Sequence, residues 1–354
     1  MTRALHQLVP SFAPRNAIGN HVLQVQDVLR GMGLDSDIYV GDAWREVAHL
    51  TKPYRDLEEL HGTWLLYQAS TGSPIAEWLL GRPEPKLVNY HNITPASLFA
   101  PWEPHVGVEL QAGRRQLVEL APATELAIAV SGYNESELVA AGYRKTAVVP
   151  ILLDTATFDR ADDPSAVDRL RADGPVWLFV GRMAPNKAQH DLLKALSVHR
   201  RTYGGNVRLR LVGGSSSHAY SSAIERYVSA LQLDDAVELC GEVSDAELAA
   251  HYRAADVFVS TSDHEGFCIP LLEAMHHGLP IVAYGSSAVP ETLGGAGLCL
   301  PTKEPTTVAA AVQRVLTDAT VRDALVAAGK QRLADFDLAA NKRRLADVLT
   351  PVLS

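Results

Sequence analysis

One segment of this chain decides how the sequence around it folds: Val176-Trp177-Leu178-Phe179-Val180-Gly181-Arg182-Met183-Ala184-Pro185-Asn186-Lys187. Its first five residues are all apolar, which is typical of a short strand buried on both faces of a parallel sheet. Gly181 ends the run, and residues 188–203 follow with leucines at helical spacing. Strand, polar turn and helix in this order predict one step of a doubly wound α/β fold.

The same alternation continues through the second half of the chain. Apolar or alternating runs predict further strands at 207–212, 237–240, 257–259 and 280–283, and helical patterns separate them at 221–231, 245–254 and 271–277. Strands that alternate with helices in this way form a parallel sheet, whose ligands bind at the carboxyl ends of the strands.

The first half repeats this logic less regularly. It predicts strands at 5–9, 37–40, 63–68, 86–90 and 126–130, and a helix at 21–32 that Gly33 closes. A second Rossmann-like unit follows, with a cleft expected between the two. Polar residues at 159–164 and 173–175 are the predicted linker. We expect domains at 1–156 and 157–335, and a helix at 336–354 that packs back on the first.

Composition excludes several classes of protein. A length of 354 residues, 47% of them hydrophobic, suits two folded domains, and a net charge of −9 disfavours nucleic acid and anionic membranes as partners. No apolar run of membrane-spanning length occurs and the first residues lack a signal core, so we expect a cytoplasmic protein. Cys240, Cys268 and Cys299 lack metal-site spacing and are predicted to be small buried side chains in a reducing compartment.

The strongest local feature is acidic: Asp263-His264-Glu265-Gly266-Phe267-Cys268-Ile269-Pro270-Leu271-Leu272-Glu273-Ala274-Met275. Pro270 suits the first turn of a helix, which predicts Glu273 in that turn and Glu265 in the loop before it. Amides near the helix start favour an anion such as phosphate. The carboxylates are predicted to accept from sugar and ribose hydroxyls. The alternative is a surface loop with a glutamate at a helix start.

Two cations follow the first strand of this half. Arg182 and Lys187 are predicted at the carboxyl end of the sheet, where a helix begins, and such a group can bind a diphosphate. A solvated loop is the alternative interpretation. The acidic loop, predicted at the same edge of the sheet, favours a binding site.

These segments together resemble family 4 of the retaining glycosyltransferases, which have the two-Rossmann GT-B fold. The resemblance rests on Phe179-Val180-Gly181-Arg182 with Lys187, on 211–214, 241–244 and 252–257, on the pair Glu265 and Glu273, and on 288–291. It is thinner in the first half, at Gly19, 90–95, 131–134 and 149–154. There the chain has Ile151-Leu152-Leu153 where the family has Asn-Gly-Val, and one glycine in place of two.

The resemblance implies roles for individual residues. Arg182 and Lys187 would neutralise the donor diphosphate, Glu273 would hold the ribose, and Glu265 would hold the sugar. His91 would lie near the anomeric carbon, Gly19 would offer a backbone amide to phosphate, and the first domain would take the acceptor. The remaining implied donor-binding residues are Val243, Gly266, Phe267, Cys268 and Ile269. The two cations would take the place of a metal at the diphosphate. His264, His276 and His277 have no clean ligand spacing, so no metal site is expected.

The resemblance also implies the reaction, which is transfer of a hexose with retained α configuration. The motifs are most similar to bacterial mannosyltransferases, so GDP-mannose is the expected donor. The alternatives are UDP-glucose or UDP-N-acetylglucosamine as donor, or a phosphorylase, epimerase or regulatory protein of the same fold. Residues 1–156 carry 12 Lys and Arg against 17 Asp and Glu. A soluble saccharide or small glycoside, such as an intracellular mannose polysaccharide, is therefore expected as acceptor in place of a membrane lipid.

Overall fold

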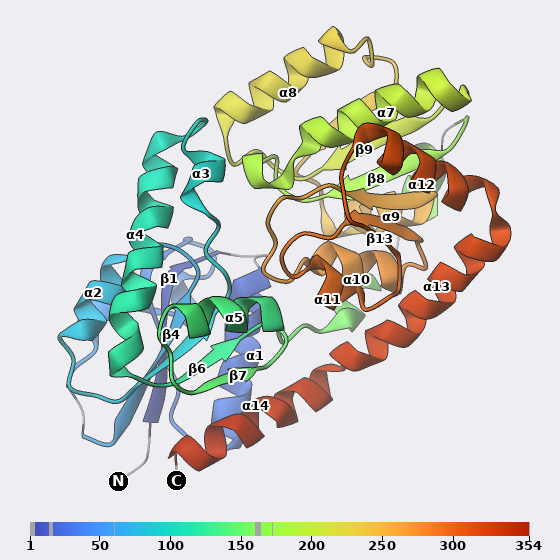
Figure 1. Cartoon of the computed structure of the whole chain (residues 1–354). Coiled ribbons are helices and arrows are strands. Elements are labelled where there is room, and N and C mark those ends of the chain that lie inside the picture. The colour runs from blue at the N-terminus through green and yellow to red at the C-terminus, as the bar shows by residue number, and fades with distance from the viewer. Residues whose placement is uncertain (1–3, 14–16, 60, 160–163, 172, 354) are drawn as a thin grey trace. The chain divides into compact units, whose positions relative to one another are not determined.

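The protein consists of two compact α/β units (Figure 1). The computed structural model describes residues 4–13, 17–59, 61–159, 164–171 and 173–353. Unit 1 comprises Met1–Ala100, Pro104–Asp154 and Phe336–Ser354, and unit 2 comprises Pro101–Glu103 and Thr155–Asp335.

Unit 1 contains a seven-stranded parallel sheet in the order β3-β2-β1-β4-β5-β6-β7. All strands predicted in this half are present. The bounds are β1 (Ala4–Phe12), β2 (Ile38–Ala43), β3 (Lys52–Pro53), β4 (Thr63–Ala69), β5 (Lys86–Tyr90), β6 (Thr124–Ala129) and β7 (Thr146–Val148). The helices are α1 (Ala17–Gly31), α2 (Pro74–Leu80), α3 (Ala96–Phe99), α4 (Pro104–Leu120), α5 (Gly132–Ala140) and α14 (Leu338–Leu353), with 3-10 turns η1 (Ala48–Leu50), η2 (Tyr54–Asp56) and η3 (Ala121–Ala123).

Unit 2 contains a six-stranded parallel sheet in the order β10-β9-β8-β11-β12-β13. Its strands are β8 (Val176–Val180), β9 (Arg208–Val212), β10 (Val237–Gly241), β11 (Val257–Ser260), β12 (Ile281–Tyr284) and β13 (Leu298–Leu300). The helices are α6 (Pro164–Leu170), α7 (Gln189–Tyr203), α8 (His218–Ala230), α9 (Asp245–Ala254), α10 (Ile269–His276), α11 (Val289–Leu293), α12 (Pro305–Thr317) and α13 (Ala319–Leu333). The 3-10 turns are η4 (Thr155–Asp159) and η5 (Pro185–Lys187), and η6 (Ala334–Phe336) lies where the chain passes from unit 2 to the last segment of unit 1.

The strand order reverses once in each sheet. The chain runs outward from β1 to β3 and then returns to β4 on the other side of β1, and it makes the same reversal between β8 and β11. Loops on either side of such a reversal diverge, which leaves the carboxyl edge of the sheet open to a ligand.

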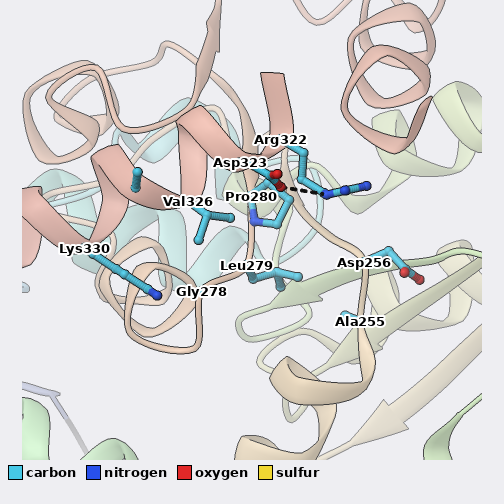
Figure 2. A pocket seen from close by; sticks show the side chains of 10 residues that line it. Ala255, Asp256, Gly278, Leu279, Pro280, Arg322, Asp323, Val326 and Lys330 are labelled. Carbon is cyan, nitrogen blue, oxygen red and sulfur yellow. Dashed lines mark hydrogen bonds and ion pairs between the residues drawn. The ribbon is translucent and has the colours of Figure 1, made fainter. Parts of the chain in front are cut away.

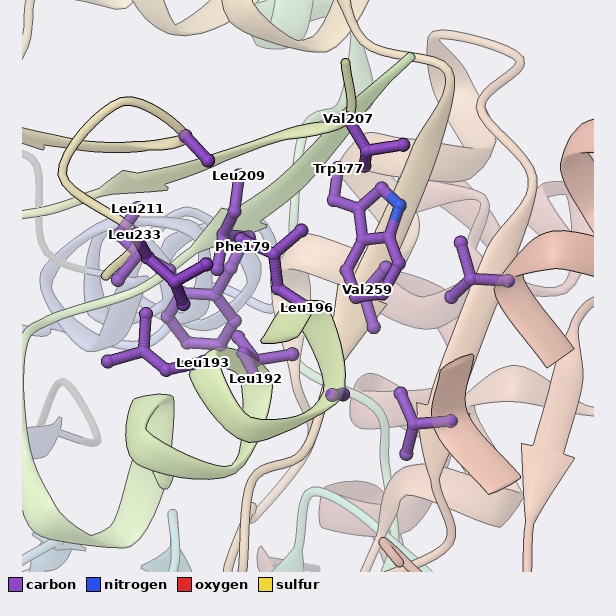
Figure 3. Close-up of a cluster of buried hydrophobic side chains, with 14 of the residues drawn as sticks. Trp177, Phe179, Leu192, Leu193, Leu196, Val207, Leu209, Leu211, Leu233 and Val259 are labelled. Carbon is purple, nitrogen blue, oxygen red and sulfur yellow. The ribbon is translucent and has the colours of Figure 1, made fainter. Parts of the chain in front are cut away.

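The apolar run that opens the second half lies at the centre of unit 2. Trp177 and Phe179 of β8 are buried beside Leu209 and Leu211 of β9 and the leucines of α7 (Figure 3). A strand covered on both faces needs apolar residues without alternation, which is the pattern that residues 176–180 show.

Helix α14 belongs to unit 1 although it ends the chain. Leu345, Leu349 and Leu353 are buried in one cluster with Leu5 of β1 and with residues of α1. An ion pair joins Lys342 Nζ to Asp27 of α1 at 2.6 Å. Burial of three leucines on one helical face holds this helix against α1.

Several boundaries differ from the sequence-based predictions. Helix α10 begins at Ile269, two residues before its predicted start, and α8 begins at His218 because the Ser217 side chain caps it. Residues 160–163 of the predicted linker lie outside the described residues, and Pro164–Leu170 forms α6. The division between the units falls after Asp154.

The prediction of three buried cysteines is right only for Cys268. Cys240 is partly exposed and Cys299 is exposed, and all three are free thiols. Cys240 lies on β10 and Cys299 on β13, the two edge strands of the six-stranded sheet. Edge strands lack a covering neighbour on one side, which explains the exposure. Among the described helices, none has the length and apolar character needed to cross a membrane.

Leu349→Ala is predicted to destabilise unit 1 by about 2–5 kcal/mol, because it deletes a fully buried side chain and leaves a cavity. The matched control is Asp347→Ala on the exposed face of the same helix, which should change stability by less than about 0.5 kcal/mol. Urea unfolding measures both variants. Equal unfolding midpoints would show that α14 does not stabilise the unit.

Candidate functional site

Three of the predicted site residues lie on loops at the carboxyl edge of the sheet of unit 2. Arg182 and Lys187 follow β8, and Glu265 follows β11. These two strands are neighbours in the sheet although 76 residues lie between the last residue of β8, Val180, and the first residue of β11, Val257. The reversal of strand order therefore brings both loops to the same place.

Lys187 and Glu265 form an ion pair at this edge. The ammonium donates to both carboxylate oxygens, Oε1 at 2.7 Å and Oε2 at 2.8 Å. Glu265 is buried and Lys187 is largely buried. A lysine ammonium has three donors, so this geometry leaves one N–H of Lys187 for another acceptor.

Backbone and side-chain hydrogen bonds join the same two loops. The Asp263 amide donates to the Asn186 carbonyl at 2.8 Å, and Asn186 Nδ2 donates to the His264 carbonyl at 3.2 Å. Ala188, which ends η5, has a φ of +48°, so the chain turns sharply between Lys187 and α7. These contacts hold Lys187 and Glu265 in place before any ligand binds.

The loop after β12 supports Glu265 from a third strand. The Glu265 amide donates to Ser287 Oγ at 2.9 Å, and Thr292 Oγ1 donates to the Phe267 carbonyl at 2.6 Å. Three successive strand ends of the sheet thus position one carboxylate.

Arg182 differs from Lys187 in having no side-chain partner among the described residues. It is exposed, and its backbone carbonyl accepts from Gln189 Nε2 at 2.9 Å. An exposed guanidinium keeps all five N–H donors for an anion, and its planar geometry suits two oxygens of a phosphate.

The start of α10 offers fewer amides than the sequence suggested. Pro270 has no amide hydrogen, and the Leu271 amide donates to the Cys268 carbonyl at 3.1 Å. Cys268 and Ile269 precede the first amide that bonds within α10, so their amides stay candidates for contact with an anion. Cys268 has a φ of +72°, a strained conformation for a residue other than glycine.

The predicted position of Glu273 in the first turn of this helix is wrong. The helix begins one residue before Pro270, so Glu273 lies in the second turn. The reason is that proline is tolerated at either of the first two helical positions, since neither amide bonds within the helix.

Glu273 has a partner of its own. Tyr252 Oη donates to its carboxylate at 2.7 Å, and the Tyr252 ring stacks on His277 at 5.3 Å between centroids. Burial raises the pKa of Glu273 above its ordinary value, and the bond from Tyr252 offsets part of that rise. Its predicted role toward a ribose stays a prediction.

Lys303 is a residue of this edge that the sequence analysis missed. It follows β13, and its ammonium contacts Asp191 Oδ2 of α7 at 2.7 Å and Asp263 Oδ1. It therefore ties the acidic loop to α7. Its strand has only three residues, too few to give an apolar pattern, so nothing in the sequence indicated that a cation reaches this edge.

His91 follows β5 in unit 1 and begins a buried chain of polar groups. His91 Nε2 lies 2.7 Å from Gln68 Oε1, Gln68 Nε2 donates to Gln7 Oε1 at 2.7 Å, and Gln7 Nε2 donates to the Val22 carbonyl. Since the Gln68 oxygen accepts, His91 carries its proton on Nε2. Burial lowers the pKa of His91 to about 3, so the ring is neutral at physiological pH.

Two further predicted residues occupy defined positions. Gly19 is buried in the first turn of α1, seven residues after the last residue of β1. Val243 is partly exposed directly before Ser244, which caps α9 through a capping box with Glu247. Among the described side chains, no group of His, Cys, Asp or Glu is arranged to hold a metal ion.

A cavity of about 600 Å³ in unit 2 lies at the opposite edge of the sheet. Figure 2 shows Val326 and Arg322 of α13 beside Pro280, the residue before β12. None of the candidate residues lines it. The amino ends of parallel strands are not where such sheets bind ligands, so this cavity does not extend the candidate site.

Comparison with known proteins agrees with this geometry. Residues 174–318, which contain β8 and both loops of the ion pair, match the family model described as "Glycosyl transferases group 1". These residues are a glycosyl transferases group 1 domain. The resemblance stated from the sequence is confirmed, and the sheets of both units have the GT-B fold.

The relatives of this domain are named as D-inositol 3-phosphate glycosyltransferases and as mannosyltransferases. The D-inositol 3-phosphate glycosyltransferase of Kineococcus radiotolerans is 34% identical over 67% of this chain and 58% of its own length. A GDP-mannose-dependent alpha-(1-6)-phosphatidylinositol monomannoside mannosyltransferase of Mycolicibacterium smegmatis is 27% identical over 82% of this chain and 83% of its own. The match to the first of them thus spans little more than half of that protein.

A solved structure shares the fold across both units. HepE of Anabaena, crystallised with UDP-glucose, has a TM-score of 0.75, 18% identity and coverage of 98% of this chain and 99% of its own.

Glu273→Gln is predicted to stabilise the unliganded protein at neutral pH. Below the ordinary pKa of 4.5 both folded and unfolded states hold the proton. Between that value and the raised folded pKa only the folded state holds it, so stability falls as pH rises and stays lower above the folded pKa. A glutamine still accepts from Tyr252 and carries no charge to desolvate.

Thermal unfolding from pH 4 to 8 measures this effect. Buried histidines such as His91, whose pKa is lowered, act in the opposite direction in both proteins, so the difference in Tm between variant and wild type is the quantity to follow. This difference should grow in favour of Glu273→Gln as pH rises, while Glu225→Gln on the exposed face of α8 should show no such change. A lower Tm for Glu273→Gln than for the wild type at pH 7 would contradict the assignment.

Proposed function

We propose that this chain is a nucleotide-sugar-dependent hexosyltransferase. The observation that carries the proposal is the Lys187–Glu265 ion pair at the reversal of strand order in a glycosyl transferases group 1 domain, with Arg182, which has no side-chain partner in the described part of the chain, on the same loop as Lys187. The two cations suit a diphosphate and the carboxylate suits sugar hydroxyls, so one edge can take both halves of a nucleotide sugar.

We propose that Arg182 and Lys187 stabilise the leaving group of the transfer reaction. Transfer breaks the bond between the anomeric carbon and the diphosphate oxygen and forms one to the acceptor oxygen. Arg182 and the remaining Lys187 donor would offset the negative charge that develops on the diphosphate. We propose that the acceptor attacks from the face that the diphosphate leaves, and that a diphosphate oxygen takes the acceptor proton. The sugar then keeps its α configuration.

GDP-mannose is the donor we propose first. The support is the M. smegmatis relative, which is named as GDP-mannose-dependent and aligns with 82% of this chain. A UDP-sugar is the second candidate, supported by HepE, whose structure was solved with UDP-glucose. The experiment below separates the two.

For the acceptor we propose a water-soluble saccharide or small glycoside in the cytoplasm. The excess of acidic residues in 1–156 would repel an anionic bilayer. Three free thiols, one of them exposed, suit a reducing compartment.

A thermal-shift comparison of GDP and UDP tests the donor site. The preferred nucleotide should stabilise the protein by about 2.7 kcal/mol at about one hundred times its Kd. Arg182→Ala should weaken binding by about tenfold or more, because it removes a charged hydrogen bond to phosphate. Arg208→Ala, an exposed arginine where β9 begins, is the matched control and should bind like the wild type. A shift with UDP alone would reject GDP-mannose, and no shift with either would reject the proposed function.

Transfer activity is predicted to survive EDTA, because protein cations supply the positive charge that a divalent ion would otherwise bring to the diphosphate. The measurement is release of nucleotide diphosphate with and without chelator. Activity that disappears with EDTA and returns with Mn²⁺ or Mg²⁺ would reject the roles given to Arg182 and Lys187.

A further inference from the structure

The chain of polar groups behind His91 in unit 1 has a direction, and one backbone group sets it. Gln7 Nε2 donates to the Val22 carbonyl at 3.0 Å, and a carbonyl oxygen can only accept. The amide nitrogen of Gln7 therefore faces α1, and its Oε1 is left to accept from Gln68. Both glutamines are fully buried, so water does not compete for these hydrogen bonds.

The same direction passes through Gln68 to His91. Gln68 Nε2 donates to Gln7 Oε1 at 2.7 Å, so Gln68 presents its Oε1 to His91 Nε2, which lies 2.7 Å away. A half turn of the Gln68 amide would place its oxygen against the Gln7 oxygen, and two acceptors repel each other. The Val22 carbonyl thus determines, through two glutamines, that the proton of His91 lies on Nε2.

The other ring nitrogen of His91 is an acceptor without a donor. His91 Nδ1 is shielded from solvent and has no hydrogen-bond partner among the described residues. Burial lowers the pKa of His91 to about 3, so no proton occupies Nδ1 at neutral pH. Buried polar atoms are normally hydrogen-bonded, so this nitrogen lacks a donor that a ligand can supply.

The titratable group packed against this ring is His21 of α1. The two rings meet edge-on with 5.0 Å between their centroids, and the Leu152 amide donates to His21 Nδ1 at 2.9 Å. Burial lowers the pKa of His21 well below its ordinary value, so both rings are neutral at physiological pH. The pair of histidines therefore adds no charge to this end of the sheet.

His91 lies where a ligand can reach it, and the glutamines do not. It is the first residue after β5, at the carboxyl edge of the seven-stranded sheet, and it is partly exposed. Ligands of open α/β sheets bind at this edge. Gln68 and Gln7 lie behind it in β4 and β1 with no exposed surface, so they can act on a ligand only through His91.

We infer that Gln68 and Gln7 are positioning residues, which hold His91 in the tautomer that accepts a hydrogen bond at Nδ1. A ligand at this edge then meets an uncharged acceptor, to which one of its hydroxyl groups donates. This role toward a ligand rests on the proposed transferase function, whose substrates carry hydroxyl groups. The geometry gives His91 no part as a general acid, because Gln68 holds the Nε2 proton and Nδ1 carries none.

Imidazole NMR of the whole chain, labelled with nitrogen-15 histidine, measures the tautomer, and His91→Asn assigns the His91 signals. The wild type should show one tautomer, protonated on Nε2, that does not titrate between about pH 5 and about pH 8. Gln7→Met removes the group that orients Gln68, although Gln68 still contacts His91. The Gln68 amide can then turn, and we expect part of the His91 population to carry its proton on Nδ1.

Substitutions of Gln68 separate a hydrogen bond from simple packing. Gln68→Met should also release the tautomer, whereas Gln68→Glu should keep it, because a carboxyl group in either ionisation state offers an oxygen to His91 Nε2. Gln24→Met, in a partly buried glutamine of α1 outside this chain of groups, is the matched control. It should leave the His91 signals unchanged.

Transfer kinetics test the consequence for the reaction. Gln7→Met and Gln68→Met should each lower kcat/KM by about tenfold, and Gln68→Glu should retain more activity than Gln68→Met. The thermal shift with nucleotide should stay as in the wild type, because these residues belong to unit 1 and the diphosphate is assigned to unit 2.

A wild-type proton on Nδ1, titration of His91 within that pH range, or wild-type signals in Gln7→Met would overturn the inference. The wild-type spectrum decides even where a variant does not fold. Wild-type kcat/KM in a variant with an altered tautomer would overturn the role toward a ligand. A wild type that no nucleotide stabilises refutes the transferase and leaves the tautomer as measured, so the two failures are distinguishable.

Discussion

The reversal of strand order beside β8 is the constraint on which the candidate site depends. Each parallel strand must be followed by a crossover, and crossovers on the two sides of β8 run in opposite directions. The loops after β8 and β11 consequently meet at the sheet edge. The Lys187–Glu265 ion pair joins these loops, and loss of either partner would leave a largely buried charge unpaired.

The three cations at this edge of the sheet differ in the number of carboxylates that they contact. Lys303 is held between two carboxylates, Lys187 is held by one, and Arg182 has none among the described residues. Paired cations are fixed in position before a ligand arrives, and the unpaired one can bind it. Such preorganised charge needs no rearrangement when negative charge develops, which is the property that leaving-group stabilisation requires. In the same domain, burial raises the pKa of Glu273, so ionisation of this carboxylate lowers the stability of the folded state.

The two units use one topology for different chemistry. Both sheets reverse beside their first strand, and in unit 2 the edge at the reversal carries the ion pairs of Lys187 with Glu265 and of Lys303 with Asp191 and Asp263. His91, neutral because of its burial, adds no charge to the edge of unit 1.

Local pattern in the sequence determined the long strands, helices α1, α7 to α10 and α14, and the loops that carry Arg182, Lys187 and Glu265, whereas α2, α4 and α5 were not predicted. A short, continuous run of apolar residues such as 176–180 is enough to predict a strand that is buried on both faces. Strands β3, β7 and β13 have only two or three residues, which is too short for a recognisable hydrophobic pattern. Because β13 was not predicted, Lys303, which follows it, was not predicted to reach this edge. Only the tertiary structure decided which side chains meet. Lys303 with Asp191, Tyr252 with Glu273, and the exposure of Cys299 all depend on which strands lie side by side and which lie at an edge, and packing between distant segments sets that order.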